Sequence, residues 1–219
     1  NNVLKSLMVY TKDAVIWGNS IYAGAMFAMI TVFEGLWAHP FFKYVWGFSV
    51  QQASTCNAYL LIGIAVGAPI SGFLARNKYR YQLMIIIAIL LLISFFTIIK
   101  YGHLFPLYLI HSLLFMIGLI SSSYVISNSV ASARAHDQDK TAVVGWNNML
   151  VVLPAPLIQP VVGWWIDLAK GTSIADHYIY SLIGFTDILL FMFLISAFLM
   201  WFGYKYQQPV NLMADDCDI

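Results

Sequence analysis

The chain of 219 residues is 61% hydrophobic and only 10% charged, and its mean hydropathy is +0.77. Soluble domains are about 45–50% apolar and about 25% charged, so the composition excludes an ordinary soluble domain and indicates a membrane protein with several spans. The net charge of +1 gives no reason to expect a nucleic-acid partner. The two cysteines, Cys56 and Cys217, predict neither a disulfide framework nor a metal site, and no cofactor is expected.

Long apolar segments alternate with short polar connections along the chain. Because a bilayer core needs about 20 residues of helix per crossing, the sequence predicts an all-α fold of six transmembrane helices. The predicted spans are residues 14–37, 50–75, 82–99, 104–130, 141–168 and 178–204. They form one six-helix transmembrane domain over residues 14–206. Residues 1–13 read as a cytoplasmic connecting segment and 207–219 as a cytoplasmic tail.

The basic residues divide unequally between the two sides that these spans define. Three lie on one side, namely Lys43, Lys100 and Lys170. Eight lie on the other side, namely Lys5, Lys12, Arg76, Lys78, Arg80, Arg134, Lys140 and Lys205. Lys and Arg stay preferentially in the cytoplasm, so we expect both termini to be cytoplasmic.

The six spans differ in how many polar residues they carry at depth. The third span is apolar on every face and the sixth nearly so, and we expect both to be peripheral and to face lipid. The other four are expected to line a polar interior. The candidate binding or pathway residues on these four spans are Asn19, Tyr22, Asn57, His111, Asn147, Asn148 and Gln159.

Small residues recur every four positions along the second span, at Gly63, Gly67, Ser71 and Ala75. This spacing places them on one helix face, where small side chains let two backbones approach closely. We therefore expect this face to pack against another helix.

The fifth span, GWNNMLVVLPAPLIQPVVGWWID, holds Pro154, Pro156 and Pro160 together with two asparagines and a glutamine. Proline removes a backbone donor and clashes with the preceding turn, and in lipid the carbonyl groups that it frees must be satisfied by protein or a water-filled cavity. The stretch predicts a kinked helix inside the bundle. Such a helix either lines a solute pathway or is a buried helix held by interhelical hydrogen bonds.

Four stretches resemble the C-terminal six-helix half of a bacterial major facilitator superfamily transporter. They are FEGLWAHPFF, GFLARNKYRY, TAVVGWNNML and QPVVGWWID. GFLARNKYRY is similar to the family's cytoplasmic gating loop, with Gly72 and Arg80 matching and Arg76 standing where the family has Asp. The positive-inside effect also accounts for the basic residues of this loop.

The resemblance implies alternating access, in which two six-helix halves rock about a site near the middle of the bilayer. It therefore implies a second six-helix half, in the same full-length chain or as a separate piece. It also implies a location in the bacterial inner membrane.

Two acidic residues within the spans are candidates for proton coupling, because an ionisable group in the bilayer is costly and marks a functional site by default. Asp187 lies nine residues into the sixth predicted span. It either takes up and releases protons, or is a protonated group facing a neighbouring helix or a partner domain. Glu34 lies near the outer mouth, as a gate or proton acceptor, or as a partner of Lys43 or a helix cap. With Asn57, His111 and Gln159, it forms one polar site if their faces converge.

The function predicted from these residues is secondary active transport of a small polar organic solute, coupled to protons. The alternative is a membrane receptor or interaction module on the same scaffold that does not transport. No motif of an intramembrane enzyme is present, so no enzymatic activity is expected.

Overall fold

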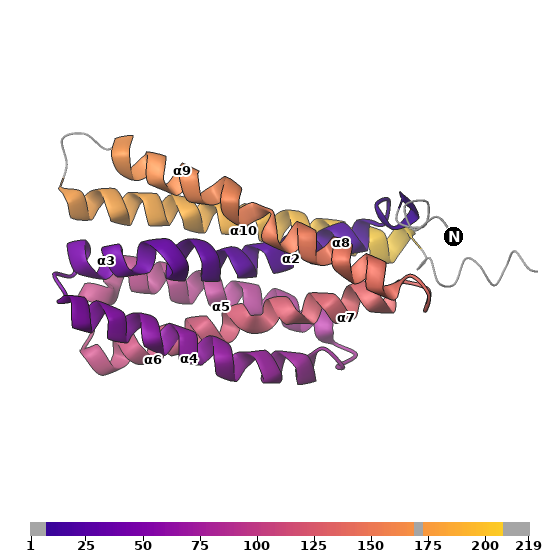
Figure 1. Cartoon of the computed structure of the whole chain (residues 1–219), viewed down its shortest axis with the longest axis horizontal. Helices are drawn as coiled ribbons and strands as arrows, with labels where there is room; N and C mark the ends of the chain where they lie inside the picture. The colour runs from indigo at the N-terminus through magenta and orange to yellow at the C-terminus, as the bar shows by residue number, and fades with distance from the viewer. Residues whose placement is uncertain (1–7, 169–172, 208–219) are drawn as a thin grey trace, which may run out of the picture.

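The computed structural model describes residues 8–168 and 173–207. Within these ranges the chain forms helices and no strands, and six helical segments are long and apolar enough to cross a membrane. They lie side by side as one elongated bundle (Figure 1). The predicted all-α membrane fold with six spanning helices is confirmed. Lys5, Lys170, the start of the predicted connecting segment and the tail from residue 208 lie outside the described residues.

The first span runs from Ala14 to Val45 and consists of three helical pieces. They are α2 (Ala14–Ala28), the π-helical segment η1 (Met29–Trp37) and α3 (Ala38–Val45). The predicted end at residue 37 is wrong, because Pro40 lies in the first turn of α3, where a missing backbone N–H breaks no hydrogen bond. The span therefore continues for two further turns.

The remaining spans are close to their predicted positions. Their helices are α4 (Val50–Leu74), α5 (Arg80–Tyr101) with η2 (Gly102–Leu104), α6 (Leu107–Ser121), η3 (Ser122–Val125), α7 (Ile126–Ala133), α8 (Lys140–Val152), α9 (Pro154–Leu168) and α10 (Ile174–Tyr206). Side-chain caps set several helix starts. Ser49 and Gln52 form a reciprocal capping box at α4, and Ser173 caps α10.

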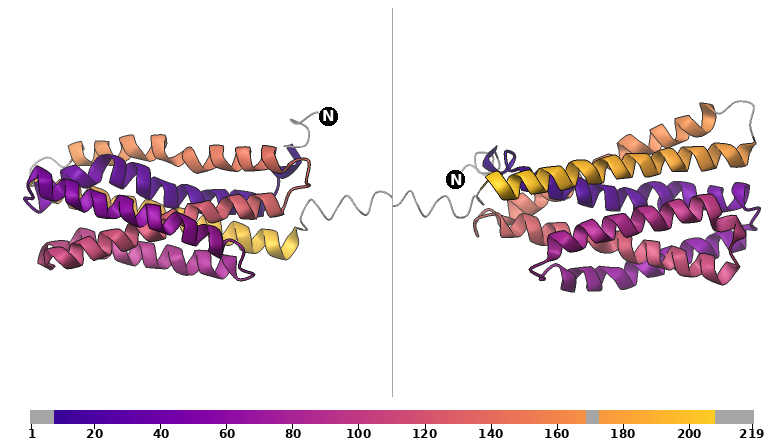
Figure 2. Two further views of the ribbon diagram at one scale, coloured as in Figure 1. Left: turned by 60° about the horizontal axis from the view of Figure 1, so that its bottom comes forward. Right: turned by 180° about the vertical axis from the view of Figure 1, so that it is seen from behind.

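The fifth span is broken at Leu153, between α8 and α9. Pro154 begins α9, a position where proline fits because its missing donor would be unpaired anyway. The interruption falls where the prolines predict a kink. Its predicted place inside the bundle is wrong: α9 lies at the edge, and Pro156 and Pro160 are exposed (Figure 2). One face alone is buried, through residues such as Ile158 and Val162.

Two spans are central to the bundle. In their most apolar windows, 56% of the residues in the first span and 50% of those in the fourth are buried, against 22–33% in the other four. The third and sixth spans are peripheral as predicted. The second and fifth are at least as exposed, however, which corrects the expectation that both would line the interior.

The predicted small-residue face of α4 packs against α6 and η3, which confirms its role. Gly63, Gly67, Ser71 and Ala75 are all buried. A methyl group on Gly63 would collide with the backbone carbonyl of Phe115, and one on Gly118 of α6 would collide with that of Leu60. The two backbones are therefore in direct contact here.

Gly118→Ala is expected to lower the free energy of unfolding by about 1–3 kcal/mol, because the added methyl group overpacks the contact between α4 and α6. Thermal unfolding of the purified protein in detergent measures the change. Gly145→Ala is the matched control, since no atom lies within 4 Å of the position of its Cβ. That variant should be unchanged or more stable by about 0.5–1 kcal/mol. Equal destabilisation by both variants would contradict the proposed contact.

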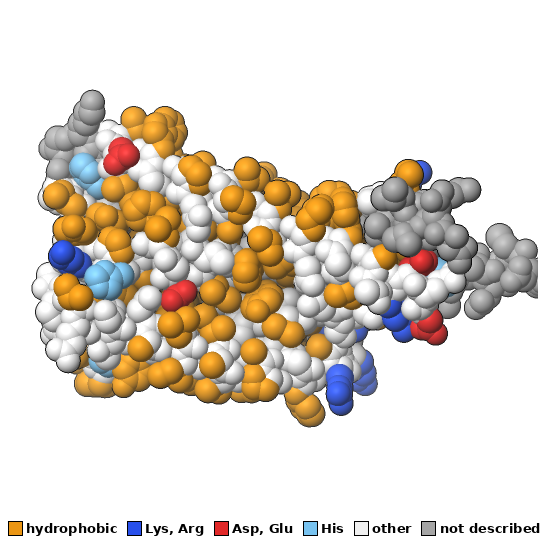
Figure 3. Space-filling view, in the orientation of Figure 1, with side chains coloured by type: hydrophobic (Ala, Val, Ile, Leu, Met, Phe, Trp, Pro, Cys, Tyr) orange, Lys and Arg blue, Asp and Glu red, His pale blue; other side chains and the backbone are white. Residues whose placement is uncertain are grey.

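Charged side chains gather mainly at the two ends of the bundle, and the middle of the surface is largely apolar (Figure 3). Among the described residues, we call one end the basic end because it carries seven of the Lys and Arg residues: Lys12, Arg76, Lys78, Arg80, Arg134, Lys140 and Lys205. Lys43 and Lys100 lie at the opposite end. The apolar middle is the surface expected to contact lipid.

Candidate functional site: polar side chains within the bundle

The acid that lies against polar partners within the bundle is Glu34 on η1. Its side chain is half-buried, and the side-chain Nδ2 of Asn57 on α4 donates to its Oε1 at 3.1 Å and to its backbone carbonyl at 3.4 Å. The Oδ1 of Asn57 is buried and has no hydrogen-bond partner. The site therefore holds more hydrogen-bond acceptors than donors. The side-chain NH2 of Asn57 donates to two oxygens of Glu34, and the Oδ1 of Asn57 is left without a donor.

No basic side chain compensates Glu34. The ion pairs within the described part of the chain are Asp13 with Arg134 and Asp137 with Lys140. The predicted pairing with Lys43 is absent, since its Nζ lies over the ring of Tyr44 at 5.4 Å from the ring centroid. The helix-cap alternative is also wrong, because Glu34 lies within a continuous helical span.

A side chain of α9 reaches η1 from the other side and donates a hydrogen bond to one of its backbone carbonyl groups. The side-chain Nε2 of Gln159 donates to the backbone carbonyl of Thr31 at 3.0 Å. A π-helix shifts the backbone pairing from four to five residues, and such turns occur frequently at functional sites. The polar side chains of α4 and α9 thus both reach the segment that carries Glu34.

His111 does not join this site. Its ring stacks on that of Tyr59, with the ring centroids 4.3 Å apart and the planes at 13°. Tyr59 is two residues from Asn57, and helical residues two apart point to different sides. The structure therefore brings Glu34 and Asn57 together, whereas Gln159 reaches the same segment at Thr31 and His111 does not join them.

A second polar cluster, the asparagine cluster, joins α2, α7 and α8. The Nδ2 of Asn19 and the Oγ of Ser20 donate to the Oδ1 of Asn147 at 3.1 and 2.7 Å. The Nδ2 of Asn147 donates to the Oγ of Ser127 at 2.8 Å and to the Oδ1 of Asn128 at 2.9 Å. Asn19 and Asn147 are fully buried, so in this conformation both hold helices together. Asn148, the next residue, is exposed.

Tyr22 belongs to a contact at η3. Its hydroxyl group pairs with the Oγ of Ser123 at 2.8 Å, and the Oγ of Ser71 on α4 pairs with that of Ser122 at 3.1 Å. Tyr22 is buried. The fourth span is therefore interrupted by a 3₁₀ turn that is bonded to both α2 and α4, and such mid-helix turns often mark hinges.

Asp187 lies apart from all of these groups. It is exposed on α10, on the side that faces away from the bundle, and no side chain in the described ranges forms a hydrogen bond or ion pair with it. It lies 13 residues from the start of α10, or about 20 Å along a helix about 50 Å long. The carboxyl group is therefore deep in the membrane but outside the polar interior.

The basic end carries an ion pair that the sequence analysis missed. The Nε of Arg134, at the end of α7, lies 2.5 Å from the Oδ2 of Asp13, and both side chains are buried. The other oxygen of Asp13 caps α2 by accepting from the backbone amide groups of Val15 and Ile16. Asp13 stands directly before an apolar run, which is a recognisable N-cap signal. Nothing in the sequence pairs it with Arg134, 121 residues later.

Further contacts close the basic end. The hydroxyl group of Tyr10 donates to the Oδ2 of Asp139 at 3.0 Å and accepts from the backbone amide of His136. Burial raises the pKa of Tyr10, which keeps this donor protonated. The Oε1 of Gln207 accepts from the backbone amide of Ala14 at 2.8 Å.

The predicted gating loop takes no part in these contacts. Arg76 is exposed, a methyl group on Gly72 would meet no atom within 4 Å, and the Nη2 of Arg80 donates to the hydroxyl group of its neighbour Tyr81 at 3.2 Å. The loop that makes contacts at the basic end is instead the one between α7 and α8.

The fold and these sites together define an all-α integral membrane protein whose polar groups are largely bonded inside a six-helix bundle. Across the described ranges, no three His, Cys, Asp or Glu side chains lie close enough together to hold a metal ion. Comparison of the chain with protein-family models, with curated proteins and with solved structures finds no match.

Arg134→Leu is expected to lower the free energy of unfolding by about 3–5 kcal/mol, because it leaves the buried carboxylate of Asp13 without its partner. Thermal unfolding in detergent measures this loss. Lys140→Ala is the control, since it breaks an ion pair with Asp137 that is exposed to solvent and should leave the melting temperature almost unchanged. Similar losses in both variants would mean that the buried pair contributes no more than a surface pair.

Proposed function

We propose that this chain is one six-helix half of a secondary active transporter of the major facilitator type, which moves a small polar organic solute by alternating access and couples this movement to protons. The observation that carries the proposal is Glu34. A carboxyl group lies within a spanning helix, beside polar partners and without a compensating cation. The resemblance of four sequence stretches to that superfamily is the second support.

Energetics favours a functional role for Glu34. Inserting an acidic residue into the bilayer costs about 2.5–3.5 kcal/mol, and acids kept there usually line ion or proton pathways. Asn57 supplies one donor group and also holds an acceptor without a partner. A site with more acceptors than donors favours the binding of a proton or of a solute's N–H or O–H groups.

The irregular turns of the two central spans support a moving scaffold. η1 interrupts the first span beside Glu34, and η3 interrupts the fourth beside Tyr22. In transporters, substrate sites are typically formed by interrupted helices near the midplane of the bilayer. The break at Leu153 gives the fifth span a similar joint.

In this proposal the second six-helix half covers part of the exposed surface of the bundle. α4 and α9 carry many exposed residues together with the two side chains that reach η1, Asn57 and Gln159. The excess of Lys and Arg supports a cytoplasmic basic end, and the resemblance to bacterial transporters supports an inner-membrane location. The buried pair of Asp13 and Arg134 would then hold the cytoplasmic side closed.

A receptor or interaction module without transport is the second candidate, and the asparagine cluster favours it. Asn19 and Asn147 are fully buried and bonded to each other and to Ser127. Polar residues whose role is to hold helices together are explained without a solute pathway, as a protein that does not transport requires.

Glu34→Gln in the complete two-half protein is expected to reduce uptake driven by a proton gradient by about tenfold or more, while binding of the same solute remains. Glutamine can still accept from Asn57 but cannot carry a proton. Uptake of a pooled library of small solutes into proteoliposomes, followed by binding assays, measures both.

Asp187→Asn is the matched control for this experiment. It removes the second acid considered for proton coupling, but at a position that faces away from the polar interior, and uptake should stay at the parent level. Unchanged uptake in Glu34→Gln would refute coupling through Glu34. Binding without uptake of any solute by the parent protein would favour the receptor.

A further inference from the structure

The outward face of α10 presents one acid in an otherwise apolar row. Asp187, Phe191, Leu194, Phe198 and Trp201 are spaced by four, three, four and three residues, and we call this row the α10 stripe. All five are exposed, and the four apolar side chains are 56–64% exposed. Lipid tails satisfy the apolar members but offer nothing to a carboxyl group, so lipid alone is a poor cover for this face.

The spacing of the α10 stripe matches the seam of two helices that pack in parallel. Alternating steps of four and three residues place side chains at the d and a positions of a heptad, and Asp187 then occupies a d position. A polar residue in such a seam needs a polar partner across it, so Asp187 favours the register in which its two copies meet. Copies of this chain insert with one orientation, so their α10 helices run in the same direction.

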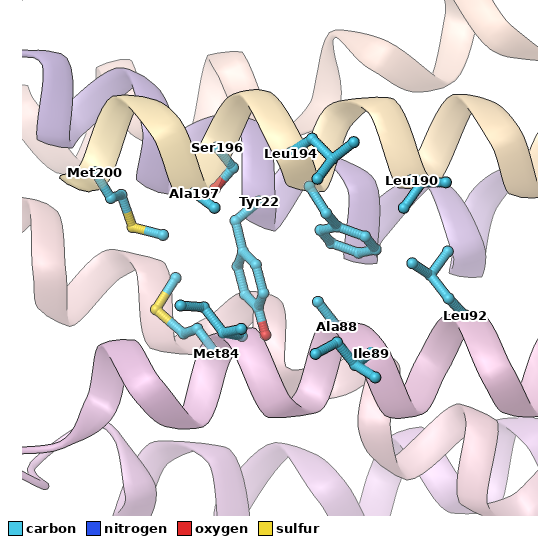
Figure 4. Close-up of a pocket in the computed structure, with 12 residues that line it drawn as sticks. Tyr22, Met84, Ala88, Ile89, Leu92, Leu190, Leu194, Ser196, Ala197 and Met200 are labelled. Atoms are coloured by element: carbon cyan, nitrogen blue, oxygen red, sulfur yellow. The ribbon is translucent and has the colours of Figure 1, made fainter. Parts of the chain in front are cut away.

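A groove runs beside the stripe, between α10 and α5. Figure 4 shows Leu190 and Leu194 of α10 facing Ala88, Ile89 and Leu92 of α5 across it. Its volume is about 160 Å³, and its lining is almost entirely apolar. An apolar cavity of about 150 Å³ accommodates a benzene ring, so this groove has room for one aromatic side chain. Phe191 and Phe198 on the stripe are side chains of that size, which makes the face complementary to itself.

We propose that the α10 stripe is the interface of a parallel homodimer, in which Asp187 of each copy pairs with Asp187 of the other and aromatic side chains of each copy enter the groove of its partner. A two-fold axis along the membrane normal places both carboxyl groups at one depth. A carboxyl group in hydrocarbon is favoured as the neutral acid, which has one O–H donor and a carbonyl acceptor. Two such groups satisfy each other through two O–H···O hydrogen bonds. The proposal is independent of transport.

Disulfide cross-linking in proteoliposomes tests this interface with the complete protein. In a background without the native cysteines Cys56 and Cys217, Leu194→Cys places one thiol in the stripe, and oxidation should yield dimers because facing positions of a parallel seam lie within disulfide reach. Leu90→Cys on α5 is the matched control. Leu90 is also an exposed leucine, 47% exposed, on a side of α5 away from the groove, and it should yield no dimer at the same protein density.

Three further substitutions separate the pairing of the two acids from nonspecific apolar association. Asp187→Leu in the Leu194→Cys background should weaken dimerisation by about tenfold, as expected for the loss of interhelical hydrogen bonds in a membrane. Asp187→Asn should retain it, since an amide also donates and accepts. Ala197→Leu, which adds bulk to the groove without changing the stripe, should also weaken it. Melting temperatures close to that of the parent establish that each variant is folded.

The opposite results would overturn the proposal. Cross-linking at Leu194→Cys no greater than at Leu90→Cys would show that the stripe does not meet its copy. Dimerisation unaffected by Asp187→Leu would exclude the carboxyl pair.

Discussion

The absence of water in the hydrocarbon core is the constraint on which the rest of this structure depends. Polar groups within the spans gain most from partners in the protein, and the positions of those partners determine which helices lie together. Asn147 is the clearest case. Its side-chain amide on α8 bonds to four side chains, two on α2 and two on α7, so these three helices meet where it lies. The carbonyl of Thr31, bonded by Gln159, fixes α9 against the first span in the same way.

Close backbone contact is the second means of holding helices together in this bundle. Without a hydrophobic driving force between helices in lipid, packing and hydrogen bonds must supply the attraction. Gly63, Gly67 and Gly118 bring α4 and α6 into backbone contact, and Ser71 continues this face to a hydrogen bond with Ser122. The fourth span is thus held against α4 both along α6 and at its irregular turn.

Much of the fold follows from local sequence, and much of the site does not. The six spans, the small-residue face of α4 and the break before Pro154 each depend on residues within one helix, so periodicity and composition suffice to predict them. The continuation of the first span past residue 37 was missed because His39 and Pro40 resemble a loop, although Pro40 is tolerated in a first turn.

Contacts across long sequence separations could not be predicted in this way. Asn57 and Gln159 were expected near Glu34 by depth alone, which is right for them but wrong for His111, because depth gives no information about which side of a helix faces which neighbour. The pairing of Asp13 with Arg134, and the outward direction of Asp187, also depend on helix packing.

The divided carboxylate of Asp13 has a consequence for how the basic end can move. One oxygen bonds to the amide groups of Val15 and Ile16, and the other bonds to Arg134. Because both oxygens belong to one carboxylate, moving α7 and Arg134 away would also disturb the hydrogen bonds that cap the first turn of α2. Movement of α7 and loosening of α2 are therefore coupled. The amide hydrogens of Val15 and Ile16 would then exchange with solvent when this end opens, so their protection reports the free energy of that opening.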